Sequence, residues 1–190
     1  MQAQRSVRIV GICGASATGK TVLATKLAEV SPVVMLSADW YFHKPRKIGP
    51  CRKSPCCWEQ LSSVDLEALA QDLRELTTDL SRVPPGPVPD LLFGSSAHNV
   101  SGVGKNNPAR ITRDGFTLTN EPVVVVVEGF LLFGDPDVCE QLHAGIFLTA
   151  DDGELLARRR FQRSGGSLED AAAWASFRDE YMSHIYQHHL

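Results

Sequence analysis

Short apolar runs recur along the chain and are separated by amphipathic segments. Runs at residues 7–13, 33–37, 123–129 and 146–149 are rich in Val, Ile and Leu and are bounded by polar residues or turn formers. This pattern is typical of short buried β-strands. The unbroken valines at 123–127 predict a strand that is buried on both faces, as the central strands of parallel sheets are.

Apolar residues between these runs recur at steps of three and four, which predicts amphipathic helices. Helices are expected over 21–29, from Ser62 onward, over 152–163 and from Ser167 onward. Ser62 or Ser63 is expected to cap the second helix, because a serine side chain accepts a hydrogen bond from an exposed helix N–H group. The expected core-facing residues are Leu66, Leu69, Leu73, Leu76 and Leu80 in the second helix, and Trp174, Phe177, Tyr181 and Ile185 in the last.

The alternation of strands and helices predicts a three-layer α/β fold, in which a mostly parallel central sheet lies between helices. Ligands of such folds bind at the carboxyl ends of the strands. The length of 190 residues, 43% of them hydrophobic, suits a single domain. Two stretches break the pattern: residues 40–58 predict an irregular loop over the ligand edge, and residues 84–120 predict a surface excursion with a hairpin at 109–118.

The formal charge of −3 is too small to attract nucleic acid or an anionic membrane to the whole surface. We therefore expect a small-molecule ligand, with no nucleic acid and no membrane as a partner. The chain opens with no leader-like segment and has no apolar run near the roughly 18 residues of a membrane span, so a soluble, cytoplasmic protein is expected. The sequence does not define an oligomeric state.

Five cysteines, at positions 13, 51, 56, 57 and 139, are expected to be free thiols, because their number is odd and no secretory signal accompanies them. An alternative is a zinc site built from Cys51, Cys56, Cys57 and His43. Free thiols are favoured, because these residues lack the paired C-x2-C spacing of structural zinc sites.

A phosphate-binding pattern, G-x-x-x-x-G-K-[ST], is matched by Gly14-Ala15-Ser16-Ala17-Thr18-Gly19-Lys20-Thr21. The segment follows a predicted strand and precedes a predicted helix, as such loops do. Gly14 and Gly19 permit backbone angles that let successive N–H groups converge on a phosphate at the helix N-terminus. Lys20 is expected to reach the β- and γ-phosphates, and the Thr21 hydroxyl to bind Mg²⁺. The alternative is a Gly-rich turn that precedes an ordinary helix by chance.

Two acidic residues end predicted strands at the same edge as this loop. Asp39, just after the second strand, is a candidate base or acceptor for a substrate hydroxyl and a candidate Mg²⁺ ligand. Glu128, at the end of the valine strand, is a candidate to complete the Mg²⁺ site with Thr21. The alternatives are a strand-end cap for Asp39 and, for Glu128, a carboxylate that only closes a buried strand, which is costly without a partner.

The third predicted helix carries a cluster of arginines. Arg159 and Arg163 are four residues apart and share one helical face, whereas Arg160 projects in another direction. The Gly165-Gly166 break that follows suits a mobile lid, which would close over phosphates and exclude water. The alternative is a plain amphipathic helix with solvated arginines.

Four strings of residues resemble a known family. They are Gly14 to Thr21, Ser37-Ala38-Asp39-Trp40-Tyr41-Phe42, Glu128-Gly129-Phe130-Leu131-Leu132-Phe133 and Arg158-Arg159-Arg160-x-x-Arg163. With these strings the chain resembles the nicotinamide riboside kinases, within the uridine kinase and phosphoribulokinase group of P-loop kinases. The third string favours the riboside kinase branch. The resemblance holds in order from residue 7 to residue 185, apart from residues 84–120.

The resemblance implies a single P-loop kinase domain over residues 1–190, with a three-layer P-loop NTPase fold and an arginine-bearing lid helix. It implies that ATP and Mg²⁺ are used to phosphorylate the 5′-hydroxyl of a nucleoside. The implied acceptor is nicotinamide riboside, whose product, nicotinamide mononucleotide, belongs to NAD biosynthesis. The family continues past the equivalent of Leu190 into a further strand and helix that flank the adenine, and this segment is expected to be absent here.

The resemblance also implies roles for single residues. Asp39 matches the catalytic base and, with Thr21, the magnesium ligands. Arg160 matches an arginine on the substrate side, and Arg159 and Arg163 match arginines that face ATP. The nucleoside pocket is implied at Asp39, Trp40, Tyr41, Phe42, Trp58 and Glu59, where Glu59 replaces the shorter Asp of the family.

Other functions remain open beside this one. A uridine or cytidine kinase would use the same chemistry, because the pocket alone selects the base. A regulatory GTPase is disfavoured, because residues 105–108, Lys-Asn-Asn-Pro, lack the aspartate of the guanine-reading Asn-Lys-x-Asp string. A catalytically silent nucleotide-binding protein would keep the fold without the reaction.

Overall fold

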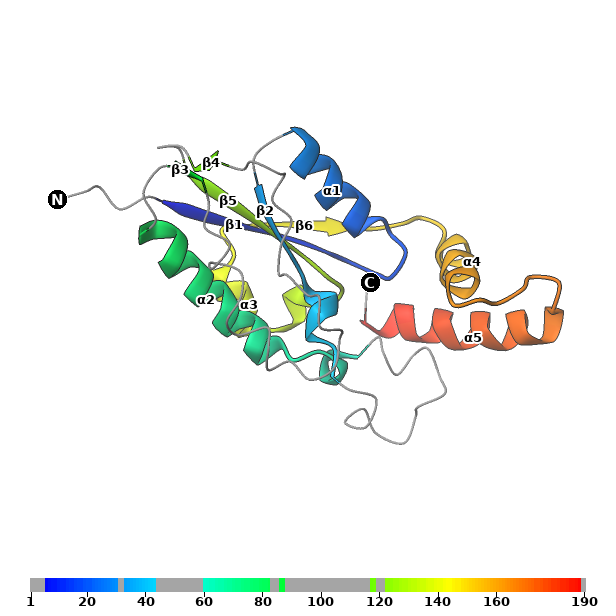
Figure 1. The fold of residues 1–190 in the computed structure, drawn as a ribbon. Helices are drawn as coiled ribbons and strands as arrows, with labels where there is room; N and C mark the ends of the chain where they lie inside the picture. The colour runs from blue at the N-terminus through cyan, green and yellow to red at the C-terminus, as the bar shows by residue number, and fades with distance from the viewer. Residues whose placement is uncertain are drawn as a thin grey trace.

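The structure is a computed structural model that describes residues 6–30, 33–43, 60–82, 86–87, 117–118 and 122–188. Its centre is a sheet of parallel strands (Figure 1) in the order β2-β5-β1-β6. These strands are β1 (Val7–Gly14), β2 (Val33–Ser37), β5 (Val123–Glu128) and β6 (Ala144–Leu148). The predicted parallel sheet is therefore confirmed, although β6 begins at Ala144 and not at Ile146.

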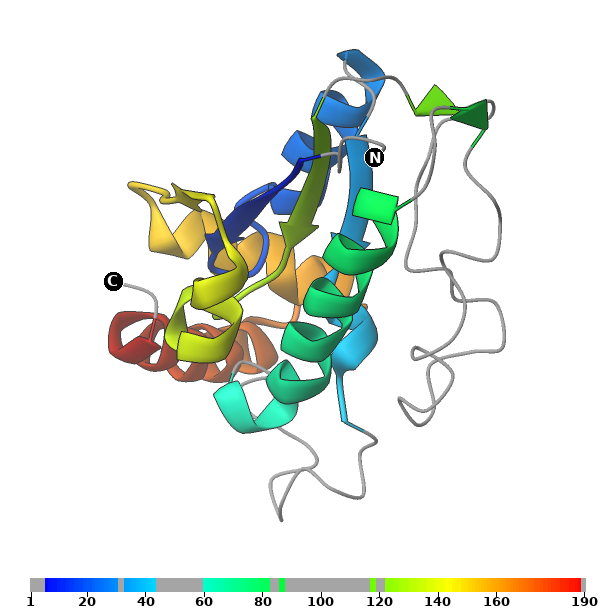
Figure 2. The ribbon, with the colours of Figure 1, turned by 90° about the vertical axis from the view of Figure 1, so that its left-hand side faces the viewer.

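Helices lie on both faces of this sheet and beyond the carboxyl ends of its strands (Figure 1). They are α1 (Lys20–Val30), α2 (Leu66–Arg82), α3 (Pro136–Gln141), α4 (Gly153–Arg163) and α5 (Ala171–His188). Helix α1 covers one face, and α2 and α3 cover the other (Figures 1 and 2), which confirms the three-layer α/β fold. The last two helices, α4 and α5, lie beyond the carboxyl ends of the strands (Figure 1).

Strand β5 shows how the core is divided between the two faces. Successive side chains of a strand point to opposite sides, so Val125 and Val127 pack in one cluster with Leu69 of α2. Val126 packs in a second cluster with Ala24 of α1. These five side chains are at most 2% exposed. The predicted burial of the valine strand on both faces is confirmed.

The start of α2 differs from the predicted one. Asp65, and not Ser62 or Ser63, caps the helix, because its carboxylate accepts a hydrogen bond from the Ala68 N–H at 3.1 Å. Ser63 belongs to a separate 3-10 turn, Leu61–Ser63, which precedes the helix. The predicted core-facing side of α2 is confirmed, with the following leucines buried or packed against the core: Leu66, Leu69, Leu73, Leu76 and Leu80.

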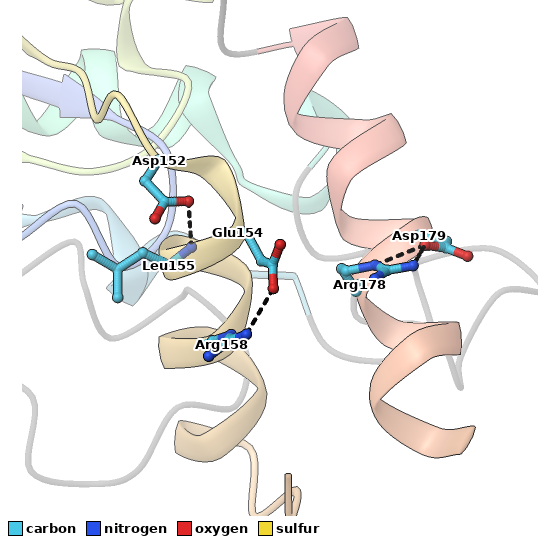
Figure 3. A network of polar contacts seen from close by, with 6 residues as sticks. All are labelled: Asp152, Glu154, Leu155, Arg158, Arg178 and Asp179. Atoms are coloured by element: carbon cyan, nitrogen blue, oxygen red, sulfur yellow. Dashed lines mark hydrogen bonds and ion pairs between the residues drawn. The ribbon is translucent and has the colours of Figure 1, made fainter. Parts of the chain in front are cut away.

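Helix α3 has no counterpart among the predicted elements, because a helix this short shows no clear apolar period. The residues at its start are nevertheless typical of a helix N-terminus. Asp135 accepts a hydrogen bond from the Val138 N–H at 2.9 Å, and Pro136 occupies the first turn. Helix α4 begins in the same way, because Asp152 accepts from the Leu155 N–H at 3.0 Å (Figure 3). Caps of this kind fix where each helix starts.

Only the base of the predicted surface excursion is described. Short strands β3 (Gly86–Pro87) and β4 (Thr117–Leu118) pair antiparallel, which brings the two ends of the excursion together. The remainder of the hairpin expected at 109–118 lies outside the described residues, as do residues 44–59 of the expected loop and the side chain of Ile185. None of the helices in the described ranges combines the length and the hydropathy that a membrane crossing requires.

The cysteine expectations are described only in part. Cys13 is buried in the main core and Cys139 is half-buried, and both are free thiols. Cys51, Cys56 and Cys57, and with them the zinc alternative, lie outside the described residues.

We expect Asp65→Ala to lower the free energy of unfolding by about 1 kcal/mol, because the first turn of α2 loses its cap. The control is Ser62→Ala, which removes an exposed hydroxyl from the preceding turn and should change stability by less than about 0.5 kcal/mol. Urea denaturation at neutral pH measures both. An equal or larger effect in Ser62→Ala would return the capping role to the serine.

Candidate active site

The phosphate-binding pattern forms a loop between β1 and α1. Gly14, with a φ of 145°, lies against Leu148 of β6, and a Cβ at this position would clash with the Leu148 carbonyl oxygen. Gly19, directly before α1, has a φ of 96°. Lys20 is 8% exposed and donates from Nζ to the Ala15 carbonyl oxygen at 2.8 Å. The predicted order of strand, loop and helix is confirmed, and the Lys20 ammonium is held inside the loop.

The carboxylate of Glu128 joins three elements at the carboxyl edge of the sheet. The parallel register places Ser37 of β2 beside Glu128 of β5, and the Ser37 hydroxyl donates to Glu128 Oε1 at 2.5 Å. The Thr21 hydroxyl, from the first turn of α1, donates to Glu128 Oε2 at 3.3 Å. Glu128 is 3% exposed. Both of its oxygens are therefore hydrogen-bonded, as a buried carboxylate requires.

Burial raises the pKa of Glu128 above its ordinary value, because the ionised carboxylate loses its hydration. The negative charge of Asp39 acts in the same direction. The hydrogen bond from Ser37, the charge of Lys20 and the hydrogen bond from Thr21 oppose the shift but do not cancel it. A cation bound beside Glu128 would stabilise the ionised form.

Asp39 lies in the 3-10 turn Ala38–Tyr41, which follows β2. Ser37 caps this turn, because its Oγ accepts from the Asp39 N–H at 3.4 Å while its hydroxyl donates to Glu128. Gly129 lets the turn approach the end of β5, since a Cβ at this position would clash with the Ala38 Cβ. Asp39 and Glu128 thus reach the same edge from neighbouring strands.

Tyr41 anchors the Asp39 turn to α2. Its hydroxyl donates to Asp72 Oδ2 at 2.6 Å, and its side chain is 1% exposed. Burial, together with the hydrogen bond and the charge of Asp72, raises the pKa of Tyr41 far above its ordinary value, so the phenol stays protonated. The Asp65 N–H also donates to the Tyr41 carbonyl oxygen at 2.8 Å. The side chain that was predicted to contact the nucleoside is therefore placed in the core.

A pocket of about 620 Å³ opens over these groups, which is a size typical of small-molecule sites. The phosphate loop, both carboxylates and two arginines of α4 face the same space, as the convergence of parallel strand ends predicts. The lining residues are Ser16, Ala17, Gly19, Lys20, Thr21, Val22, Asp39, Glu128, Phe130, Arg159, Gln162 and Arg163.

Other predicted site residues do not line this pocket. Phe42 stacks on Phe130 with the ring centres 5.4 Å apart, so it supports a lining residue and is not one itself. Trp58 and Glu59 lie outside the described residues. The described candidates that do not line the pocket are Gly14, Ala15, Thr18, Trp40, Tyr41, Phe42 and Arg160.

The arginines of α4 divide between two sides of the helix. Arg159 and Arg163 line the pocket together, as their spacing of four predicts. Arg158 instead forms an ion pair with Glu154 at 2.8 Å (Figure 3), and its guanidinium lies 5.8 Å from the centre of the Trp174 ring of α5. The pocket therefore combines two carboxylates with the cationic side chains of α4.

Several residues of the site, among them Ser37, Phe130 and Gln162, were not predicted from the sequence. Ser37 shows a usable signal, because a serine at a strand end two residues before an aspartate suits the cap of a turn. Phe130 follows Glu128 at the end of β5, where ligands of parallel sheets bind. Gln162 lies three residues after Arg159 and so shares its helical face.

The oxygen groups at this edge suit Mg²⁺. This ion prefers hard oxygen ligands and is commonly held by one or two carboxylates together with waters and substrate phosphates. Thr21 and Glu128 already share a hydrogen bond, and Asp39 faces the same pocket. The buried Glu128 carboxylate, whose pKa is raised, is a group that a divalent cation would stabilise.

Comparisons with known proteins support the uridine kinase group of P-loop kinases. The chain is 25% identical over 177 residues to a uridine kinase of Lactobacillus johnsonii, with 89% of this chain and 74% of that protein covered. It is 24% identical over 154 residues to uridine kinase-like protein 3 of Arabidopsis thaliana, covering 80% of this chain but only 29% of the plant protein. A solved structure, described as a possible uridine kinase from Bacillus stearothermophilus, has a TM-score of 0.48 and 15% identity, with coverage of 92% and 84%. No protein-family model matches the chain.

The similarity to uridine kinases agrees with the wider group that the sequence motifs resemble. It does not single out the nicotinamide riboside kinases within that group. The finer assignment, to one acceptor nucleoside, is therefore a separate question from the assignment to nucleoside kinases.

We expect Glu128→Gln to change how stability depends on pH in metal-free buffer. A carboxylate whose pKa is raised in the folded state binds its proton more tightly there than in the unfolded chain, so wild-type stability falls as the pH rises above the ordinary value of 4.5. The variant has no proton to lose at this position and should become more stable relative to the wild type over the same range. Urea denaturation from pH 4 to pH 8 measures the difference. The control is Glu140→Gln, which alters an exposed carboxylate of α3, and an identical pH profile in the two variants would contradict the prediction.

Proposed function

We propose that the chain is a nucleoside kinase, a single domain over residues 1–190 that transfers the γ-phosphoryl group of ATP to the 5′-hydroxyl of a pyrimidine nucleoside. The convergence of the phosphate loop, Asp39, Glu128 and the α4 arginines on one pocket is the observation that supports this proposal most strongly. The similarity to uridine kinases supports uridine or cytidine as the acceptor.

The donor side of the proposed reaction is formed by the phosphate loop and α4. The N–H groups of the loop and the Lys20 ammonium would bind the β- and γ-phosphates of ATP. Arg159 and Arg163, which line the same pocket, would balance the charge of the phosphates. Bound Mg²⁺, held by Thr21 and Glu128 with Asp39 nearby, would neutralise charge on the phosphate oxygens.

The acceptor side is centred on Asp39. As a general base it would take the proton of the 5′-hydroxyl while the hydroxyl oxygen forms its bond to the γ-phosphorus. The bond between that phosphorus and the bridging oxygen to the β-phosphate breaks at the same time, and ADP leaves. The anchoring of the Asp39 turn by Tyr41 and Ser37 would hold the carboxylate in place for this step.

A second acceptor, nicotinamide riboside, is favoured by the string Glu128 to Phe133, which resembles the riboside kinases. The structure offers one supporting feature. Phe130 lines the pocket, and the face of an aromatic ring attracts a cation such as the positively charged nicotinamide ring. This acceptor would lead to nicotinamide mononucleotide by the same transfer.

The acceptor is identified by incubating the purified protein with Mg-ATP and one nucleoside at a time and measuring ADP release. The panel consists of uridine, cytidine, adenosine, guanosine and nicotinamide riboside. We expect uridine or cytidine to stimulate ADP release most, because the chain is similar to proteins named uridine kinase. Preference for nicotinamide riboside would support the second acceptor. If ATP binds while no nucleoside stimulates ADP release, the protein is a silent nucleotide-binding protein and the proposal fails.

We expect Asp39→Asn to lower kcat by about 10²- to 10⁴-fold, the usual contribution of a general acid or base, while the affinity for ATP changes little. Steady-state kinetics with the best acceptor, and a titration with Mg-ADP, separate the two effects. The control is Asp79→Asn, which alters an exposed carboxylate of α2. Near-normal turnover in Asp39→Asn would remove Asp39 from the role of base.

A further inference from the structure

The phosphate loop packs against the last two helices through a small apolar cluster of its own. Ala15 of the loop lies in this cluster with Phe161 of α4 and with Phe177 and Tyr181 of α5, and Ala17 packs against it. The cluster is separate from the two clusters that fill the faces of the sheet. The loop is therefore held between β1 on one side and the α4–α5 pair on the other (Figure 1).

Aromatic rings make up much of this cluster. The ring centres of Phe161 and Phe177 are 5.0 Å apart, and the rings of Phe177 and Tyr181 stack with centres 5.7 Å apart and planes 13° apart. The ion pairs of Arg158 with Glu154 and of Arg178 with Asp179 each lie within one helix (Figure 3). Ring packing thus joins α4 to α5, together with the contact of Arg158 of α4 with the Trp174 ring of α5.

A hydrogen bond joins this cluster to the backbone of the loop. The Tyr181 hydroxyl donates to the Ser16 carbonyl oxygen at 2.9 Å, and the Tyr181 side chain is 1% exposed. The next residue of the loop, Ala17, has a φ of 69°, in the left-handed region that residues with a Cβ disfavour. Such a conformation persists only where surrounding contacts impose it. The Tyr181 hydrogen bond and the packing of Ala17 against the cluster are two contacts of this kind.

We propose that Tyr181 is a positioning residue for the phosphate loop. In a trans peptide the C=O and N–H groups lie in one plane and point in opposite directions. Holding the Ser16 carbonyl toward α5 therefore turns the N–H of the same peptide unit, that of Ala17, toward the pocket that Ser16 and Ala17 line. The hydroxyl of Tyr181 sets this donor in place before any phosphate binds.

The same contact couples the loop to the arginines. Helix α4, which packs on α5 through Phe161, brings Arg159 and Arg163 to the pocket. A phosphate that engages the Ala17 N–H would thereby meet a loop and an arginine pair whose relative position is already fixed. This coupling rests on the proposed function, in which the phosphate belongs to ATP, whereas the ordering of the loop by Tyr181 does not.

The test compares Tyr181→Phe, which keeps the ring and removes only the hydroxyl, with Ser183→Ala. Ser183 lies on the exposed side of α5, where its hydroxyl bonds the Glu180 carbonyl oxygen of the same helix. Hydrogen exchange of the ligand-free proteins reports on the loop directly. We expect the amides of residues 15–18 to exchange faster in Tyr181→Phe, while those of β1 and β5 stay unchanged. Ser183→Ala should match the wild type throughout.

Titration with Mg-ADP and steady-state kinetics then measure the consequence. Tyr181→Phe should raise the Kd of Mg-ADP and the KM of ATP about 3- to 10-fold, the effect of one hydrogen bond, with the KM of the nucleoside unchanged. A variant that is only less stable would lower the melting temperature without this selective change. Unchanged exchange of the loop, or an unchanged Kd for Mg-ADP, would overturn the role of Tyr181. If the wild type binds no Mg-ADP, the proposed function fails, and the exchange of residues 15–18 alone decides whether Tyr181 positions the loop.

Discussion

A buried carboxylate constrains the architecture of the active edge. Glu128 is almost fully excluded from water, and an ionised group in that position destabilises the fold unless donors surround it. Its donors, Ser37 and Thr21, come from β2 and from the first turn of α1, while Lys20 adds a compensating charge. The ends of β2 and β5 and the start of α1 must therefore meet at one point. The parallel register of β2 and β5, which pairs Ser37 with Glu128, brings these two strand ends together.

The contacts around Glu128 also position Asp39, the residue that is proposed to act as the base. Because Ser37 also caps the following turn, the position of Asp39 depends on the same hydroxyl that satisfies Glu128. Tyr41 fixes the other end of the turn by its hydrogen bond to Asp72 of α2. The turn that carries Asp39 is thus anchored to β2 and to α2. Rigid support of this kind reduces the entropy that a reactive group loses when substrate binds.

Much of this arrangement is predictable from the sequence, for physical reasons that differ from residue to residue. The strands follow from short β-branched runs, and parallel strands place their carboxyl ends together, so Asp39 and Glu128 are expected at one edge. The shared face of Arg159 and Arg163 follows from helical geometry alone. These predictions depend only on local patterns and on the general rule for parallel sheets.

Contacts between residues that are far apart in the sequence cannot be predicted from local patterns. The side chain of Tyr41 was expected at the substrate, and its core position follows from Asp72, a partner on another element. The cap of α2 was expected at Ser62 or Ser63, but those residues belong to a preceding turn, which leaves Asp65 at the first position able to cap. Ser37 and Tyr181 likewise take their roles from partners far along the chain, Glu128 and Ser16.

The start and the middle of the phosphate-binding loop are supported by different parts of the fold. Gly14 is fixed by its close approach to Leu148 of β6, so the start of the loop cannot move without moving the sheet. The middle of the loop packs against the α4–α5 cluster, through Ala15, Ala17 and the hydrogen bond from Tyr181. A small shift of these helices would therefore move the Ala17 N–H and the pocket-lining arginines together. Binding of a phosphate by either the loop or the arginine pair would then favour the arrangement that the other needs, so that the two would act as one site.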